Sequence, residues 1–130
     1  MNDRNLITYA VDAMKNAYAP YSRFSVGAAI ECRDGSVYCG CNIENVAFGC
    51  SMCAERVALG NAITNGHRDF VKIAVVSNGS DYCFPCGTCR QVLAEFDPEI
   101  EVLCVRGDGR YVSYHLSQLL GCAFLPSQLN

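Results

Sequence analysis

Two short cysteine-bearing strings stand at the starts of two predicted helices, and this coincidence restricts the fold more than any other feature of the sequence. Residues 53–55 read C-A-E, and residues 85–89 read P-C-G-T-C. Backbone N–H groups and the positive end of the helix dipole stabilise thiolates at such positions. If both strings serve one site, the two helix starts have to converge on it.

Periodic patterns predict helices and strands in alternation along the rest of the chain. Apolar residues at helical spacing predict helices over 4–18, 53–65, 88–96 and 116–120. Strands are expected over 24–33, 36–42, 71–77, 101–105 and 111–115, with Asp34-Gly35 as a type I′ hairpin turn. This order predicts an α/β fold with three α-β-α layers, in which a mixed central sheet of about five strands carries helices on both faces.

Length, composition and charge limit the class of protein. The 130 residues predict a single domain over 1–130. A hydrophobic content of 51% with only 18% charged residues predicts a folded chain. No apolar run reaches the roughly 20 residues of a membrane span, so we expect no membrane partner. The net charge of −3 and the lack of a basic face argue against a nucleic-acid partner and favour a small ligand.

The sequence contains ten cysteines, which is a high count for its length. The N-terminus lacks the layout of a secretory signal, so we expect a cytoplasmic protein. In that reducing compartment cysteines bind metals or lie as buried thiols more often than they form disulfides. Cys32, Cys39 and Cys104 fall in predicted strands and are interpreted as small buried hydrophobes.

Cys53, Cys86 and Cys89 are the candidate metal ligands. Three thiolates on Zn²⁺ leave one coordination position open, which distinguishes a catalytic zinc site from a structural one. Spacing alone leaves other arrangements open. Cys50 or Cys83 as a fourth ligand would close the site as a structural one, and a C-x-x-C pair also occurs in thioredoxin-like redox proteins.

Glu55 favours the catalytic interpretation. It follows Cys53 by two residues in the first helical turn, so its carboxylate can stand near a metal without binding it. Zinc deaminases combine such a glutamate with a second string, P-C-x-x-C. Arg56 and Arg90 each lie close to an expected ligand, and we interpret them as donors to the sulfurs that offset the negative charge of three thiolates. A surface salt bridge is the alternative for either arginine.

Four motifs resemble the small cytidine deaminases that bind zinc through three cysteines. They are residues 53–56 (C-A-E-R), 85–91 (P-C-G-T-C-R-Q), 19–29 and 40–45 (G-C-N-I-E-N), in the family's order. The resemblance spans the whole chain. It implies zinc-dependent hydrolysis of cytidine and deoxycytidine to uridine and deoxyuridine with release of ammonia, a role in pyrimidine salvage, and Glu55 as the catalytic acid and base.

The resemblance also implies how a nucleoside substrate is held. Asn42 and Glu44 would bind the ribose hydroxyls, and side chains at alternate strand positions do face the same way. Phe24 would pack against the pyrimidine ring, and the backbone around Ala54 would hydrogen-bond to the base. The family is homotetrameric with sites at subunit interfaces, and Phe124 matches the residue that reaches a neighbouring subunit's site.

The sequence departs from the family pattern at two places. Phe48 stands where the family usually has Tyr, and Gly121-Cys122 replaces the common Pro-Gly before Ala-Phe. Alternatives to a cytidine deaminase are a deaminase of another aminopyrimidine such as blasticidin S, a nucleotide or nucleic-acid deaminase, and a non-catalytic four-cysteine zinc module.

Overall fold

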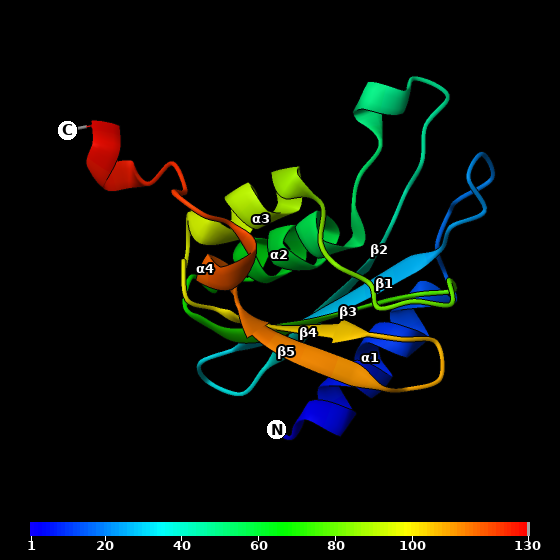
Figure 1. Cartoon of the computed structure of the whole chain (residues 1–130), viewed down its shortest axis with the longest axis horizontal. Helices are drawn as coiled ribbons and strands as arrows, with labels where there is room; N and C mark the ends of the chain where they lie inside the picture. The colour runs from blue at the N-terminus through cyan, green and yellow to red at the C-terminus, as the bar shows by residue number, and fades with distance from the viewer. Residues whose placement is uncertain (130) are drawn as a thin grey trace.

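A five-stranded mixed sheet forms the centre of the molecule in the computed structural model (Figure 1). The structure describes residues 1–129, so residue 130 of the expected domain lies outside the described residues. The strand order is β2-β1-β3-β4-β5, in which β3 and β4 are parallel and the other neighbours antiparallel. The strands are β1 (Val26–Cys32), β2 (Val37–Cys41), β3 (Phe70–Ser77), β4 (Glu101–Val105) and β5 (Tyr111–His115).

Helices cover both faces of this sheet, which confirms the predicted three-layer α/β fold (Figure 1). One face carries α1, and the other carries α2 and α3 with α4 beside them. The helices are α1 (Asp3–Met14), α2 (Ala54–Thr64), α3 (Gly87–Ala94) and α4 (Leu116–Leu119), with 3-10 turns at Phe48–Cys50 and Pro126–Leu129. Within residues 1–129, no helix has the length and apolar character needed to cross a bilayer.

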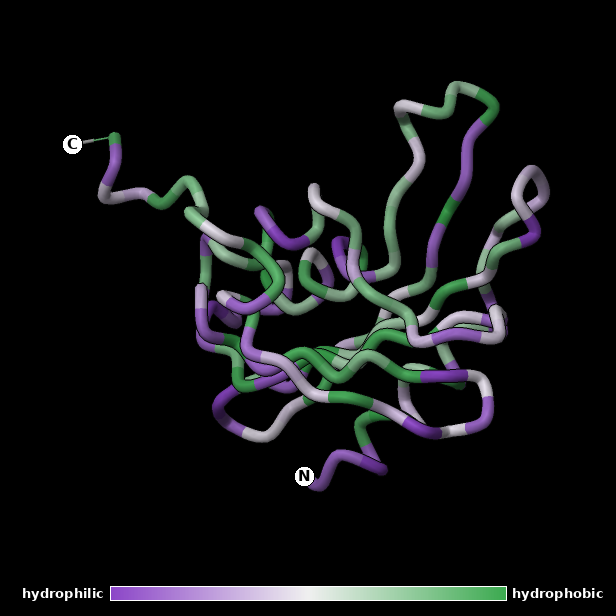
Figure 2. The backbone as a smooth tube through the Cα atoms, viewed as in Figure 1, coloured by the Kyte–Doolittle hydropathy of each residue, from purple (hydrophilic) through white to green (hydrophobic). Residues whose placement is uncertain are grey.

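Each face of the sheet has its own apolar core, because alternate strand residues point to opposite faces. Ala29, Ala74 and Leu103 pack under α1, whereas Ile30, Ile73 and Val102 pack under α2 and α3. Apolar colour is accordingly concentrated in the central strands of Figure 2. It also marks the tip of the loop between β2 and α2, which projects away from both cores.

Two glycines bring helices into backbone contact with the sheet. A Cβ atom at Gly40 would lie 2.4 Å from the backbone nitrogen of Ala58, and one at Gly27 would lie 2.1 Å from the carbonyl oxygen of Ala10. Side chains at these positions would therefore push α2 and α1 off the sheet. The contact at Gly40 fixes α2, and with it the helix start that carries Cys53.

Two local predictions differ from the structure. The first helix ends at Met14 instead of continuing to residue 18. The turn after β1 is not of type I′, because Gly35 has a φ of 92° whereas Asp34 has no positive φ. Gly35 N–H donates to the Cys32 carbonyl, and Cys32 pairs with Ser36, which makes a three-residue loop with glycine in the left-handed position.

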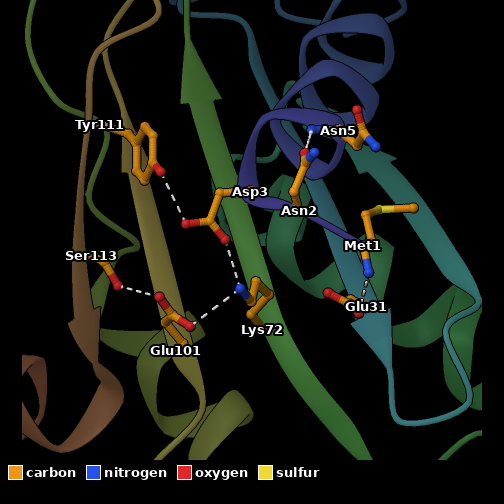
Figure 3. A network of polar contacts seen from close by, with 9 residues as sticks. All are labelled: Met1, Asn2, Asp3, Asn5, Glu31, Lys72, Glu101, Tyr111 and Ser113. Atoms are coloured by element: carbon orange, nitrogen blue, oxygen red, sulfur yellow. Dashed lines mark hydrogen bonds and ion pairs between the residues drawn. The ribbon is translucent and has the colours of Figure 1, made fainter.

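A network of charged side chains ties α1 to the sheet (Figure 3). Lys72 Nζ donates to Asp3 at 2.6 Å and lies 3.4 Å from Glu101. The Tyr111 hydroxyl donates to the second Asp3 oxygen at 3.0 Å, and Ser113 donates to Glu101. The hydrogen bond from Lys72 is the main reason that the pKa of Asp3 lies below its usual value.

We expect Asp3→Asn to lower the free energy of unfolding by about 1 kcal/mol at pH 7, because the pair with Lys72 is lost. A lowered carboxyl pKa stabilises the fold above the unfolded pKa of about 3.9, and this contribution disappears as the pH falls through the folded value. Urea unfolding at pH 7 and below pH 4 measures both effects. Asp12→Asn removes an exposed pair with Lys15 and should cause no measurable change, and equal effects of both variants would contradict the prediction.

Candidate metal centre

The starts of α2 and α3 bring three cysteine sulfurs together. Cys53 and Cys86 are the N-cap residues of the two helices, and Cys89 lies in the first turn of α3. The Sγ atoms of Cys53 and Cys86 are 3.6 Å apart, and those of Cys86 and Cys89 are 3.4 Å apart. All three lie within 4.8 Å of one another, so they can share one ion.

The geometry and chemistry of this group fit zinc. Zn–S bonds of about 2.3 Å in a tetrahedral site place the sulfurs about 3.8 Å apart, close to the separations found here. A cysteine that binds zinc does so as a thiolate. The hydrogen bond with Cys89 is the largest of the effects that lower the pKa of Cys53 to about 6, and the same bond raises the pKa of Cys89.

The group contains three sulfurs and no fourth. In the part of the chain that the structure describes, neither Cys50 nor Cys83 lies within reach of all three sulfurs. Cys50 is exposed in the 3-10 turn of the projecting loop, and Cys83 is buried elsewhere in the wall of the pocket. The arrangement therefore supplies three protein ligands and leaves a fourth coordination position free.

Glu55 lies beside the sulfurs in the first turn of α2 and is only 5% exposed. Burial raises the pKa of its carboxyl group to about 7, and the charge of Cys53 acts in the same direction. A carboxyl group with this pKa exists in both protonation states near neutral pH. It can therefore accept and release a proton without a large energetic cost in either direction.

A pocket of about 260 Å³ opens onto this group. Its walls come from the segment before β1, the end of β2, the start of α2 and the segment before α3, and they include Phe24, Asn42, Glu44, Ala54, Glu55 and Cys86. The structure thus brings the expected substrate-binding residues other than Phe124 to the same cavity as Cys53 and Cys86. The volume suits a small molecule rather than a polymer.

Asn42 and Glu44 also hold the segment before β1. Asn42 Nδ2 donates to the Phe24 carbonyl at 2.7 Å, and its Oδ1 accepts from the Val26 N–H at 2.9 Å. Glu44 accepts from the backbone N–H of Tyr21 at 3.0 Å, and from the backbone N–H and the hydroxyl of Ser22. The hydrogen bond from the Ser22 side chain is the main reason that the pKa of Glu44 is lowered.

The fold of this chain recurs in known proteins. The family model described as "Cytidine and deoxycytidylate deaminase zinc-binding region" matches residues 1–105. A cytidine deaminase of Halalkalibacterium halodurans is 44% identical over 133 residues, which cover 100% of this chain and 99% of the relative. The chain belongs to the cytidine and deoxycytidylate deaminase family. Zinc is therefore the cofactor of this protein.

A solved structure of a family member matches this chain closely. The crystal structure of cytidine deaminase from Burkholderia pseudomallei has a TM-score of 0.92 and 43% identity, and the match covers 95% of this chain and all of that chain. A blasticidin-S deaminase of Bacillus cereus is more distant, at 29% identity over 126 residues, which cover 91% of this chain and 89% of the relative.

Arg56 and Arg90 contact backbone carbonyls, whereas the sequence predicts contacts with the sulfurs. Arg56 Nη2 donates to the Ser51 carbonyl at 3.0 Å, and Arg90 donates to the carbonyls of Pro85 and Leu119 at 2.8 and 2.7 Å. Arg56 still acts on the three-sulfur group through its charge, which lowers the pKa of Cys53. Its Nε is buried without a hydrogen-bond partner in residues 1–129.

Phe124 lies outside the pocket of its own chain. Its backbone is held by Gln91, whose Nε2 donates to the Phe124 carbonyl at 2.6 Å, and its side chain is 58% exposed. The ring is therefore presented at the surface beside α3.

The Ser22 contact with Glu44 has no signal in the sequence, because the two residues are 22 positions apart and neither stands in a regular element.

A second group of possible metal ligands, formed by Cys32, Asp34 and His67, lies at the hairpin after β1. Contacts within the hairpin explain why these side chains lie together, and no ion is needed to explain it. Asp34 accepts from the backbone and the hydroxyl of Ser36 and lies 3.8 Å from His67 Nδ1. Burial raises the pKa of the Cys32 thiol, which opposes the thiolate that zinc needs. Of the two groups, the three-sulfur group is therefore the better candidate for the metal centre.

Proposed function

We propose that the protein catalyses the zinc-dependent hydrolytic deamination of cytidine and deoxycytidine, giving uridine and deoxyuridine with release of ammonia. The observation that carries this proposal is the position of Glu55, buried beside three cysteine sulfurs in a pocket that also holds Phe24 and Asn42. The family of the chain and the cytidine deaminases similar to it support the same reaction.

Cys53, Cys86 and Cys89 would hold the zinc ion. The chemistry that zinc supplies in such a site is a lowered pKa of water, so that hydroxide is available near neutral pH. The positive charge of Arg56, which favours the thiolate form of Cys53, offsets part of the negative charge of the three ligands. Arg90 would contribute by holding the carbonyl of Pro85 next to Cys86.

Glu55 would carry the protons of the reaction. It accepts a proton from the attacking water and passes it to N3 of the cytosine ring as hydroxide adds to C4. It then moves the new hydroxyl proton to the amino group, the bond between C4 and the amino nitrogen breaks, and ammonia leaves. Burial supports this double role because it brings the pKa of Glu55 to about 7.

The remaining pocket residues would orient the nucleoside. Phe24 offers its ring to the pyrimidine, and Ala54 is the first residue of α2, where backbone N–H groups have no partner within the helix. An amide and a carboxylate have more hydrogen-bonding sites than the contacts with residues 21–26 use. Asn42 and Glu44 therefore retain capacity for the sugar hydroxyls.

A homotetramer with sites at subunit interfaces would explain the apolar side chains that one chain leaves exposed. Val46 and Phe48 on the projecting loop are 77% and 75% exposed, and Phe124 is exposed beside α3. Large apolar surfaces of this kind mark contacts between proteins. In the assembly Phe124 would reach the pocket of a neighbouring subunit, in keeping with its position outside its own pocket.

A cytoplasmic role in pyrimidine salvage is the setting that we propose. All ten cysteines are free thiols, which suits a reducing compartment. The proposed reaction consumes a free nucleoside, and no further substrate is needed beyond water.

The decisive experiment follows the ultraviolet absorbance of cytidine, deoxycytidine and blasticidin S during incubation with the purified protein. We expect turnover of both nucleosides, loss of activity after dialysis against a zinc chelator, and recovery when zinc is added back. Turnover of blasticidin S without turnover of either nucleoside would contradict the proposed substrates and indicate a deaminase of another aminopyrimidine. Chelator-resistant turnover would contradict the role of zinc.

A further inference from the structure

The segment that carries Phe24 is held by Asn78, a residue that lies outside the pocket and has no role in the proposed reaction. The Phe24 side chain is 46% exposed, so packing alone does not fix it. Its neighbour Arg23 has a φ of 58°, a left-handed conformation that is uncommon for any residue but glycine. A segment with these properties keeps one conformation only if other groups hold its backbone.

All six backbone polar groups of residues 23–25 have such partners. The Arg23 N–H donates to the Ala19 carbonyl at 3.0 Å, the Phe24 N–H donates to Ser22 Oγ at 2.9 Å, and the Phe24 carbonyl accepts from Asn42. None of these contacts belongs to the sheet ladder. Half of the six groups are held by one residue, Asn78.

Asn78 forms hydrogen bonds with the residues on both sides of Phe24. Its Nδ2 donates to the Arg23 carbonyl at 3.0 Å, its Oδ1 accepts from the Ser25 N–H at 3.1 Å, and its own N–H donates to the Ser25 carbonyl at 3.0 Å. Asn78 follows the end of β3 and does not line the pocket. It therefore reaches the substrate site only through the segment that it holds.

Gly79 lies against the Phe24 ring. A Cβ atom at Gly79 would lie 3.1 Å from Phe24 Cε1 and 3.3 Å from Ser77 Oγ, so these neighbours would have to shift by a few tenths of an ångström. The glycine has no positive φ, so alanine is compatible with its backbone. A side chain at this position would therefore displace the ring and leave the hydrogen bonds of Asn78 in place.

We propose that Asn78 and Gly79 form a positioning unit, which fixes Phe24 against the pyrimidine ring of the substrate and so determines substrate affinity without taking part in the chemistry. This inference rests on the proposed function, because it concerns the same pocket. Packing against an aromatic ring stabilises bound substrate and transition state alike, so its loss raises KM and leaves kcat unchanged.

The test measures KM and kcat for cytidine in Asn78→Ala and Gly79→Ala. We expect KM to rise about tenfold in the first variant and about threefold in the second, with kcat within about twofold of the parent protein in both. Asn65→Ala is the matched control, because Asn65 also makes two side-chain hydrogen bonds, to Asn61, and lies at the far end of α2. It should leave both constants unchanged.

Repeating both changes in a Phe24→Ala background separates positioning from a general structural effect. Neither change should raise KM further there, since the ring on which they act is absent. An equal increase in both backgrounds, a fall in kcat with constant KM, or an unchanged KM in Gly79→Ala would overturn the inference. Gly79→Ala keeps the test valid if Asn78→Ala does not fold, as judged by thermal unfolding and zinc content.

Failure of the inference is distinguishable from failure of the proposed function. A parent protein that does not convert cytidine contradicts the proposed function and removes the inference with it. A parent protein that converts cytidine, with KM unchanged in the Asn78 and Gly79 variants, contradicts the positioning unit alone.

Discussion

Replacement of Glu55 by glutamine is expected to lower the turnover of cytidine by about 10⁴-fold, near the upper end of what a general acid and base contributes. An amide has almost the shape of the carboxyl group but neither takes up nor releases a proton at neutral pH. Every proton transfer in the proposed reaction passes through this residue, so no other group compensates for its loss. Steady-state kinetics by ultraviolet absorbance measures the effect.

The fold and the zinc content should be unchanged in Glu55→Gln, because Glu55 is not a member of the sulfur group. Glu99→Gln provides the control, since it makes the same chemical change at an exposed residue outside the pocket, whose Oε2 accepts from Ser117. It should retain full activity. Retained turnover in Glu55→Gln, with zinc bound, would exclude the role proposed for this residue.

Replacement of Cys89 by serine is expected to lower zinc content from about one ion per chain to near zero, with loss of activity. Cys89 is fully buried at the start of α3, and a hydroxyl in its place would not deprotonate to serve as a ligand. Zinc is quantified by a colorimetric chelator after unfolding. Circular dichroism shows whether the variant keeps its helices and strands.

Cys50→Ser is the matched control for the zinc measurement. Cys50 belongs to a C-x-x-C string with Cys53 but is exposed and lies outside the sulfur group. It should therefore bind zinc as the parent protein does. Loss of zinc from this variant would indicate a closed site with four cysteines, and the catalytic interpretation would then have to be abandoned.

Much of the fold follows from local sequence patterns. The strands Glu101–Val105 and Tyr111–His115 agree with the predicted ranges, because the Gly107-Asp108-Gly109 turn separates two apolar or alternating runs. The type of the first hairpin turn was predicted wrongly. Asp-Gly occurs in two- and three-residue loops, and the choice depends on how β1 and β2 pair, which is not a local property.

Part of the candidate site likewise follows from local sequence patterns, and part does not. Spacing in the chain singles out Cys53, Glu55 and the C-x-x-C pair, because helix starts bring residues close in sequence close in space. The hydrogen bonds of Asn78 with residues 23–25 join positions more than 50 residues apart in the chain. Only the pairing of β1 with β3 brings these positions together. Contacts of this kind cannot be found from one sequence.

The distribution of the pocket residues over the fold has a consequence for how such proteins diversify. The residues proposed to move protons and hold zinc stand at the starts of α2 and α3, and Gly40 allows α2 to lie in backbone contact with the sheet, whereas Phe24, Asn42 and Glu44 stand on connecting segments. Residues that select the substrate can therefore be changed without changing the residues that carry out the reaction. Mutational libraries confined to residues 19–25 and 42–52 can therefore exchange one aminopyrimidine for another without rebuilding the reactive centre.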